Sequence, residues 1–131
     1  MTGSHLPDEA PFPPVPVRVD PLGVDLGESL GHQLRLLSME RFDGWADLRF
    51  VRFDAGSGQR LARRVPPPEA WTVRCDQAEL RVHDAVGRGD RWFSNGEVRL
   101  VPAPPAGSVL TVEVVLADGA APLTADVDLP G

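Results

Sequence analysis

The densest group of chemically reactive side chains comprises His83, Asp84, Asp90 and Arg91. One imidazole together with two carboxylates is a ligand set that a divalent metal ion accepts. However, His83 alternates with apolar Val82 and so faces solvent, and an Asp that enters a glycine-rich turn usually caps its own backbone. We therefore expect no metal here, and we take His83, Asp84 and Arg91 as candidate binding residues.

Tryptophan supplies the second chemical feature. Trp45 and Trp92 each lie beside a predicted hairpin turn, and Arg91 directly precedes Trp92. If these indoles are exposed, they could anchor a protein partner or stack on a sugar. If they are buried, they would close the ends of a sandwich, as we expect for Trp71. Both alternatives stay open for Trp45 and Trp92.

Several catalytic classes are excluded by residue types that the sequence lacks. All 13 basic residues are Arg, so Schiff-base, phosphate-loop and Ser-Lys mechanisms have no ε-amine to use. Tyr is absent too, which excludes a tyrosine acid or nucleophile. The Gly-Ser-Gly run at 56–58 lacks the third glycine of a dinucleotide fingerprint, and the integrin-type tripeptide at 88–90 is best explained by chance. We expect no enzyme activity and no cofactor; a metal-dependent or acid-base enzyme is the least favoured alternative.

Composition and charge indicate one globular domain. The 131 residues carry a formal net charge of -6, and 42% of them are hydrophobic. Positive charge concentrates in one cluster of five arginines, namely Arg49, Arg52, Arg60, Arg63 and Arg64. This cluster could face an acidic partner, or it could balance the acidic termini across the folded surface. Because a nucleic-acid-binding protein would carry a broader basic surface, we do not expect a nucleic-acid partner.

The sequence also bears on cellular compartment. Cys75 is the only cysteine, so the chain forms no internal disulfide, and its shared parity with Trp71 and Val73 predicts a buried thiol. The first twenty residues lack the apolar run of a signal peptide, and no segment approaches the roughly twenty apolar residues that span a bilayer. We expect a cytoplasmic protein without membrane insertion.

Alternating hydrophobic residues predict β-strands along most of the chain. The alternating segments are 15–19, 33–42, 45–53, 71–75, 80–82, 110–116 and 123–129. Their intervening positions are mostly polar, which is typical of strands with one solvated face. Pro16 places the first strand at a sheet edge, because proline lacks an N–H to donate. Residues 1–14 are proline-rich and aperiodic, so we expect an extended lead-in there and a β-sandwich domain at 15–131.

Turn signals join these strands into hairpins. Asp43-Gly44, Asn95-Gly96 and Asp118-Gly119 are dipeptides of the type that supplies the positive φ angles of a type I′ turn. Short strands with turn signals about every ten residues indicate a sandwich or a small barrel. We predict an all-β fold, a single immunoglobulin-like antiparallel β-sandwich of about eight strands.

Three loose motifs suggest a family. They are Met39-Glu40-Arg41-Phe42-Asp43-Gly44-Trp45, then Leu80-Arg81-Val82-His83-Asp84 followed by Gly87, and Pro102-Ala103-Pro104-Pro105-Ala106-Gly107 before the strand at 110–114. With these motifs, the stretch from Gly27 to Leu116 resembles actinobacterial immunoglobulin-like sandwich domains of uncharacterised function. In such domains an Asp pair tends to follow the central strand, whereas here Asp84 is single and the accompanying aromatic is displaced to Trp92. The resemblance implies the fold and no activity.

These observations predict a non-catalytic protein-interaction module. Its candidate binding residues are Trp45, His83, Asp84, Arg91 and Trp92. A small-ligand or carbohydrate-binding domain is the alternative, which would use the two tryptophans with nearby Asp and Arg side chains. Pairing of an unprotected sheet edge between two copies would give a homodimer, since Pro16 protects only one edge.

Overall fold

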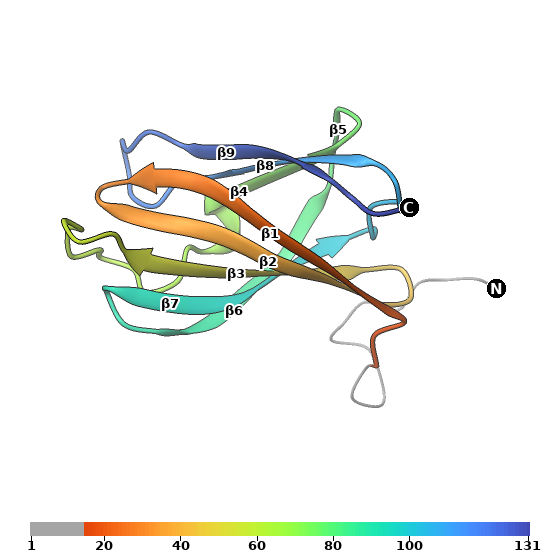
Figure 1. The fold of residues 1–131 in the computed structure, drawn as a ribbon, viewed down its shortest axis with the longest axis horizontal. Helices are drawn as coiled ribbons and strands as arrows, with labels where there is room; N and C mark the ends of the chain where they lie inside the picture. The colour runs from red at the N-terminus through yellow and green to blue at the C-terminus, as the bar shows by residue number, and fades with distance from the viewer. Residues whose placement is uncertain (1–14) are drawn as a thin grey trace.

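The computed structural model describes residues 15–131, which fold into two antiparallel sheets packed face to face (Figure 1). The strand order is β1-β2-β3-β7-β6 in the five-stranded sheet and β5-β4-β8-β9 in the four-stranded sheet. The strands are β1 (Arg18–Ser29), β2 (His32–Arg41), β3 (Ala46–Asp54), β4 (Trp71–Cys75), β5 (Ala78–Glu79), β6 (Arg81–Gly89), β7 (Phe93–Val101), β8 (Val109–Val114) and β9 (Leu123–Asp128). Within residues 15–131 the only helical element is a 3-10 turn at Pro68–Ala70. The predicted β-sandwich is confirmed, with five plus four strands rather than about eight.

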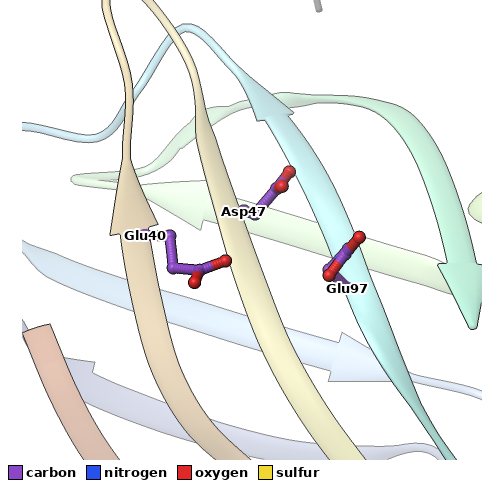
Figure 2. A group of neighbouring side chains, drawn as sticks. All are labelled: Glu40, Asp47 and Glu97. Carbon is purple, nitrogen blue, oxygen red and sulfur yellow. The ribbon is translucent and has the colours of Figure 1, made fainter. Parts of the chain in front are cut away.

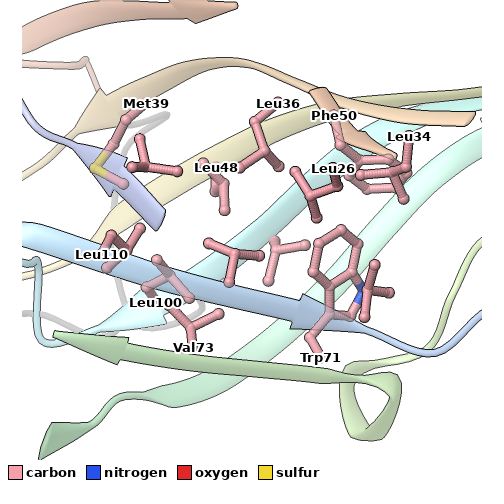
Figure 3. Packing of buried hydrophobic residues seen from close by; sticks show 14 of the residues in the cluster. Leu26, Leu34, Leu36, Met39, Leu48, Phe50, Trp71, Val73, Leu100 and Leu110 are labelled. Atoms are coloured by element: carbon pink, nitrogen blue, oxygen red, sulfur yellow. The ribbon is translucent and has the colours of Figure 1, made fainter. Parts of the chain in front are cut away.

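The hydrophobic core lies between the two sheets, where their inward-facing side chains meet (Figure 3). Leu48 and Phe50 alternate with outward residues on β3, and the ring centroids of Phe50 and Trp71 of β4 lie 5.1 Å apart. Trp71 and the Cys75 thiol are buried, which confirms both predictions. Complete burial of one such apolar side chain contributes roughly 1.5–3 kcal/mol, so contact between the sheets is the main source of stability.

The positions of two of the three predicted turns are confirmed. Asp43-Gly44 joins β2 to β3, with φ of 84° at Gly44, and Phe42 N–H donates to Trp45 O at 2.8 Å. Asp118-Gly119 lies in the connection from β8 to β9, where Gly119 has φ of 79°. Only the glycine of each dipeptide has positive φ, whereas a type I′ turn requires positive φ at the preceding Asp as well, so the predicted turn type is wrong although the turn positions are correct.

The third predicted turn, at Asn95-Gly96, is wrong. Both residues lie inside β7 and pair with β6, while the chain reverses at Asp90–Trp92, where Asp90 N–H donates to Phe93 O at 2.7 Å. Gly96 has another role, because a Cβ atom there would lie 2.1 Å from Val86 O of the neighbouring strand. The glycine therefore permits close contact of two strands and does not form a turn.

The first strand lies at a sheet edge, as Pro16 predicts. β1 is outermost in the five-stranded sheet, although it begins at Arg18 and continues to Ser29, well beyond the alternating segment. The extended lead-in predicted for residues 1–14 lies outside the described residues. In the described part of the chain, no helix is long and apolar enough to cross a bilayer.

Candidate binding site

The predicted binding residues lie at two separate ends of the five-stranded sheet. β3 pairs with β7 from Ala46 to Phe53. Trp45 directly precedes this paired segment, whereas Trp92 is next to the β7 residue that pairs with Phe53. Seven residue steps along a strand span about 23 Å, so the two tryptophans cannot contribute to one small site.

Trp45 is a packing residue. Its side chain is buried and stacks on Phe42, with ring centroids 3.9 Å apart and an interplanar angle of 9°. The guanidinium of Arg99 lies 5.6 Å from the centroid of the Trp45 ring. Trp45 is therefore a buried packing residue and not an exposed binding residue, because its indole has no exposed face for a ligand.

His83 and Asp84 lie near the start of β6, at the Trp45 end. Asp84 Oδ1 accepts the N–H of Ala85 at 2.8 Å, and Arg81 Nη2 lies 3.1 Å from His83 Nδ1. Asp90 follows the opposite end of β6. The imidazole and the two carboxylates considered as a ligand set are thus not brought together.

The other end of the sheet is organised by Arg52, the largest fully buried side chain in the described residues. Its guanidinium reaches five acceptors: Ser94 Oγ (3.1 Å), His32 Nδ1 (2.9 Å) and the carbonyl oxygens of Arg64 (3.0 Å), Asp90 (2.8 Å) and Arg91 (3.5 Å). None of these acceptors is a carboxylate. Burial lowers the pKa of the Arg52 guanidinium and Asp90 opposes this shift, but an arginine side chain keeps its proton.

The contacts of Arg52 also fix the orientation of His32. Because Arg52 donates to Nδ1, the ring proton is on Nε2, which donates to Gln59 O. Trp92 stacks over this imidazole, with ring centroids 6.3 Å apart and an interplanar angle of 17°. One buried cation therefore connects the loop after β3 with the turn between β6 and β7.

A surface pocket of about 490 Å³ lies above this network. Its lining residues are Arg60, Arg64, Asp90, Arg91 and Trp92. The carbonyl groups of three of them accept from Arg52, so the buried guanidinium lies directly beneath the pocket. Trp92 is 44% exposed, which makes it an accessible indole, in contrast to Trp45 and Trp71.

The charge balance of this pocket is positive. Three arginines line it and Asp90 is the one acidic residue among the lining residues. Asp90 Oδ1 accepts the N–H groups of Trp92 and Phe93, each at 2.8 Å, and these bonds lower the pKa of Asp90. The carboxylate therefore serves the turn at Asp90–Phe93, and part of its hydrogen-bonding capacity is not available to the arginines. This turn contains no glycine, so the expected glycine-rich turn is wrong: Gly87 and Gly89 lie within β6 and pair with β7.

A second charged cluster lies on the outer face of the five-stranded sheet. Glu40 of β2, Asp47 of β3 and Glu97 of β7 approach one another there, with carboxylate oxygens within 4.8 Å (Figure 2). Arg49 lies between two of them, with Nε 3.0 Å from Glu40 Oε1 and Nη2 3.4 Å from Glu97 Oε2. Arg99 Nε lies 3.3 Å from Asp47 Oδ1.

Asp47 is the buried member of this cluster. Burial raises its pKa to about 7, a shift that Arg99 opposes and that Glu97 and Glu40 increase. Neither Asp47 Oδ1 nor Arg99 Nε has a hydrogen-bond partner, so their contact is ionic only. Since two guanidinium groups already supply positive charge to the three carboxylates, we interpret the cluster as an ion-pair network and not as a metal site.

The sequence-predicted arginine cluster is divided in space. Arg60 and Arg64 line the pocket and Arg52 lies below it, whereas Arg49 belongs to the outer-face network. Arg63 is exposed, with Nη1 4.0 Å from Glu69 Oε1. The central role of Arg52 was not predicted, although one signal existed: Arg52 shares the parity of buried Leu48 and Phe50 and must therefore face inward.

Comparison with protein-family models, with curated proteins and with solved structures found no match to this chain. The resemblance to actinobacterial immunoglobulin-like domains thus stays a prediction.

Proposed function

We propose that this chain is a non-catalytic interaction domain that binds an acidic segment of a partner protein at the Arg60, Arg64, Asp90, Arg91 and Trp92 pocket. The observation that carries the proposal is the charge of this pocket. Three arginine side chains and the buried Arg52 face one carboxylate, and that carboxylate already accepts two backbone N–H groups. A ligand that brings carboxylates would complete the ionic balance.

The side chains present suit a peptide of Glu or Asp residues. Guanidinium groups form paired hydrogen bonds with carboxylates, and such charge-assisted bonds are about twice as strong as neutral ones. Exposed Trp92 adds an apolar surface of the kind that anchors protein interfaces. Asp90 is the only lining residue that could act as an acid or base, and its hydrogen bonds to the turn favour a structural role, which supports binding over catalysis.

A carbohydrate ligand is the second candidate, because one face of an exposed indole can stack on a sugar ring. Trp92 is the residue that favours this alternative. Salt dependence distinguishes the two candidates. Binding of a neutral sugar would not weaken as the salt concentration increases, whereas binding of an acidic peptide would.

The test is isothermal titration calorimetry of the full chain with hexaglutamate, with hexaglutamine as the neutral control peptide. We expect binding of hexaglutamate that weakens with added NaCl, because exposed ion pairs are screened. Arg64→Ala and Arg91→Ala should each weaken it by about 5- to 30-fold, because each removes a charge-assisted contact of roughly 1–2 kcal/mol. These variants keep the carbonyl groups that hold Arg52.

Arg74→Ala is the matched control, because Arg74 is an exposed arginine on β4 of the other sheet. It should leave the affinity unchanged. Equal loss of affinity in Arg74→Ala and Arg91→Ala would show non-specific charge attraction and contradict the proposal. Binding of a neutral oligosaccharide with no binding of hexaglutamate would favour the second candidate.

A further inference from the structure

The two sheets have four edge strands, and three of them are protected. β1 contains Pro21 and two register shifts, and its side chains reach the chain beyond β9: Arg18 Nη2 donates to Gly131 O at 3.0 Å. β9 lies beside β1, so these two edges cover each other (Figure 1). β5 is only two residues long. The remaining edge is β6, whose register shift lies between Val82 and Asp84. From Asp84 to Gly89 this strand contains neither proline nor a further shift.

The alternation of an antiparallel ladder shows which peptide groups of β6 face this open edge. Asp90 N–H donates to Phe93 O across the turn, and alternate residues of a strand direct their peptide groups to the same neighbour. Counting back from Asp90, residues 88, 86 and 84 face β7, whereas residues 89, 87 and 85 face outward. The Ala85 N–H agrees with this assignment, because it is bonded to the side chain of its neighbour Asp84.

The side chains of the same segment are self-complementary. Asp84, Val86 and Arg88 project from the outer face of the sheet, where their β7 pairing partners are Arg99, Glu97 and Asn95. If two copies of β6 run antiparallel with Val86 opposite Val86, each Asp84 lies opposite an Arg88 of the other copy. In the same register Ala85 lies opposite Gly87, and both are residues whose peptide groups face the open edge. On pairing, the Ala85 N–H would exchange Asp84 Oδ1 for Gly87 O of the other copy, which releases the Asp84 carboxylate to contact Arg88.

We propose that β6 pairs with β6 of a second copy of this chain, in the register centred on Val86, to form a two-fold symmetric dimer. Val86 is 38% exposed, and its contact with the other Val86 would lie between two Asp84–Arg88 pairs. Opposite charges across a strand pair are stabilising and like charges are destabilising. The register centred on Gly87 is disfavoured for this reason, since it sets Asp84 opposite Asp90.

This surface is distinct from the arginine pocket, so the two proposals can fail separately. The interface is small, so we expect a weak dimer. Sedimentation velocity of the full chain from about 5 to 500 µM would show this association. Val86→Lys should abolish it, because two lysines would meet at the symmetry axis, while Val109→Lys, at a similarly exposed valine of β8, should not change it.

Cysteine cross-linking tests the register. Val86→Cys places two thiols opposite each other in a non-hydrogen-bonded pair, a separation that a disulfide can bridge. In Arg88→Cys, the matched control, the two thiols lie four residue steps apart, about 13 Å, which is too far. Native Cys75 is buried in both variants, so it adds little background.

The expected result is a parent dimer, a monomeric Val86→Lys variant and rapid oxidative cross-linking of Val86→Cys but not of Arg88→Cys. A parent chain that stays monomeric at the highest concentration would overturn the proposal. So would a dimer that Val86→Lys leaves intact, or cross-linking at position 88 in preference to position 86.

Discussion

Arg52 and Asp47 are two buried charges on opposite faces of β3, and their surroundings differ. Arg52 contacts only neutral acceptors, yet its guanidinium reaches five of them. Asp47 has Arg99 beside it, yet its Oδ1 accepts no hydrogen bond. Arg52 is therefore stabilised by hydrogen bonds and has no acidic partner among the described residues. Asp47 has a basic partner, but its Oδ1 lacks a hydrogen bond.

This difference has consequences for the shape of the molecule. The acceptors of Arg52 come from β2, β7 and two loops, so satisfying one guanidinium fixes the wall of the arginine pocket. The partners of Asp47 come from neighbouring strands of one sheet, and they leave its pKa raised to about 7. A buried charge that is fully hydrogen-bonded positions other segments, whereas a poorly hydrogen-bonded charge makes stability depend on pH.

The largest effect is expected for Arg52→Met, which removes the charge and keeps an unbranched side chain. It leaves the Ser94 hydroxyl and the loop carbonyls without their donor, so we expect a loss of about 3–5 kcal/mol in the free energy of unfolding. Urea denaturation measures this change. Arg74→Met, at an exposed arginine, should change the free energy of unfolding by less than about 0.5 kcal/mol. Similar losses in both variants would show that the hydrogen bonds of Arg52 do not stabilise the fold.

The next effect concerns Asp47→Asn and has the opposite sign. Between pH 3.8 and about 7, the folded chain holds a proton on Asp47 that the unfolded chain has lost, so this residue makes stability fall as pH rises. At pH 8 the variant should be more stable than the parent by the order of 2–4 kcal/mol, and at pH 4 the two should be nearly equal. Thermal unfolding at both pH values checks this; a variant that is less stable at pH 8 would show that the charge contact with Arg99 outweighs burial.

A smaller loss of stability is expected for Ser94→Ala, which removes only one of the five acceptors of Arg52. The Arg52 Nε–H would then be buried without a partner, and we expect a loss of about 1–2 kcal/mol. Urea denaturation of the double variant Ser94→Ala with Arg52→Met tests whether the loss comes from the hydrogen bond between these residues. In the absence of the guanidinium, Ser94→Ala should lower the free energy of unfolding by much less. Additive losses would contradict a shared network.

Sequence reasoning predicted the parts of the fold that depend on neighbouring residues. Alternation located most of the sandwich strands, but it missed residues 20–29 of β1 and 83–89 of β6. Asp43-Gly44 gave the correct position of a turn, because glycine supplies the positive φ there. Asn95-Gly96 gave a wrong turn, because the same residue types also suit a strand whose neighbour comes very close. Local sequence could not distinguish these two uses of glycine.

The binding site was predicted only in part. Arg91 and Trp92 do line the pocket, and Arg60 and Arg64 were recognised as members of a basic cluster. The inward parity of Arg52 was legible in the sequence, but its acceptors lie 12 to 42 residues away along the chain. Which loops meet over a buried side chain depends on the packing of the whole sandwich.

The most direct test of the account is an NMR titration of the full chain with hexaglutamate, which follows the tryptophan indole and arginine Nε–H signals. We expect the signals of Trp92, Arg60, Arg64 and Arg91 to shift, because these side chains line the positive pocket. The indole signals of buried Trp45 and Trp71 should stay unchanged. Shifts that are absent at saturating peptide, or that are confined to the outer-face network of Arg49 and Arg99, would contradict the proposed site.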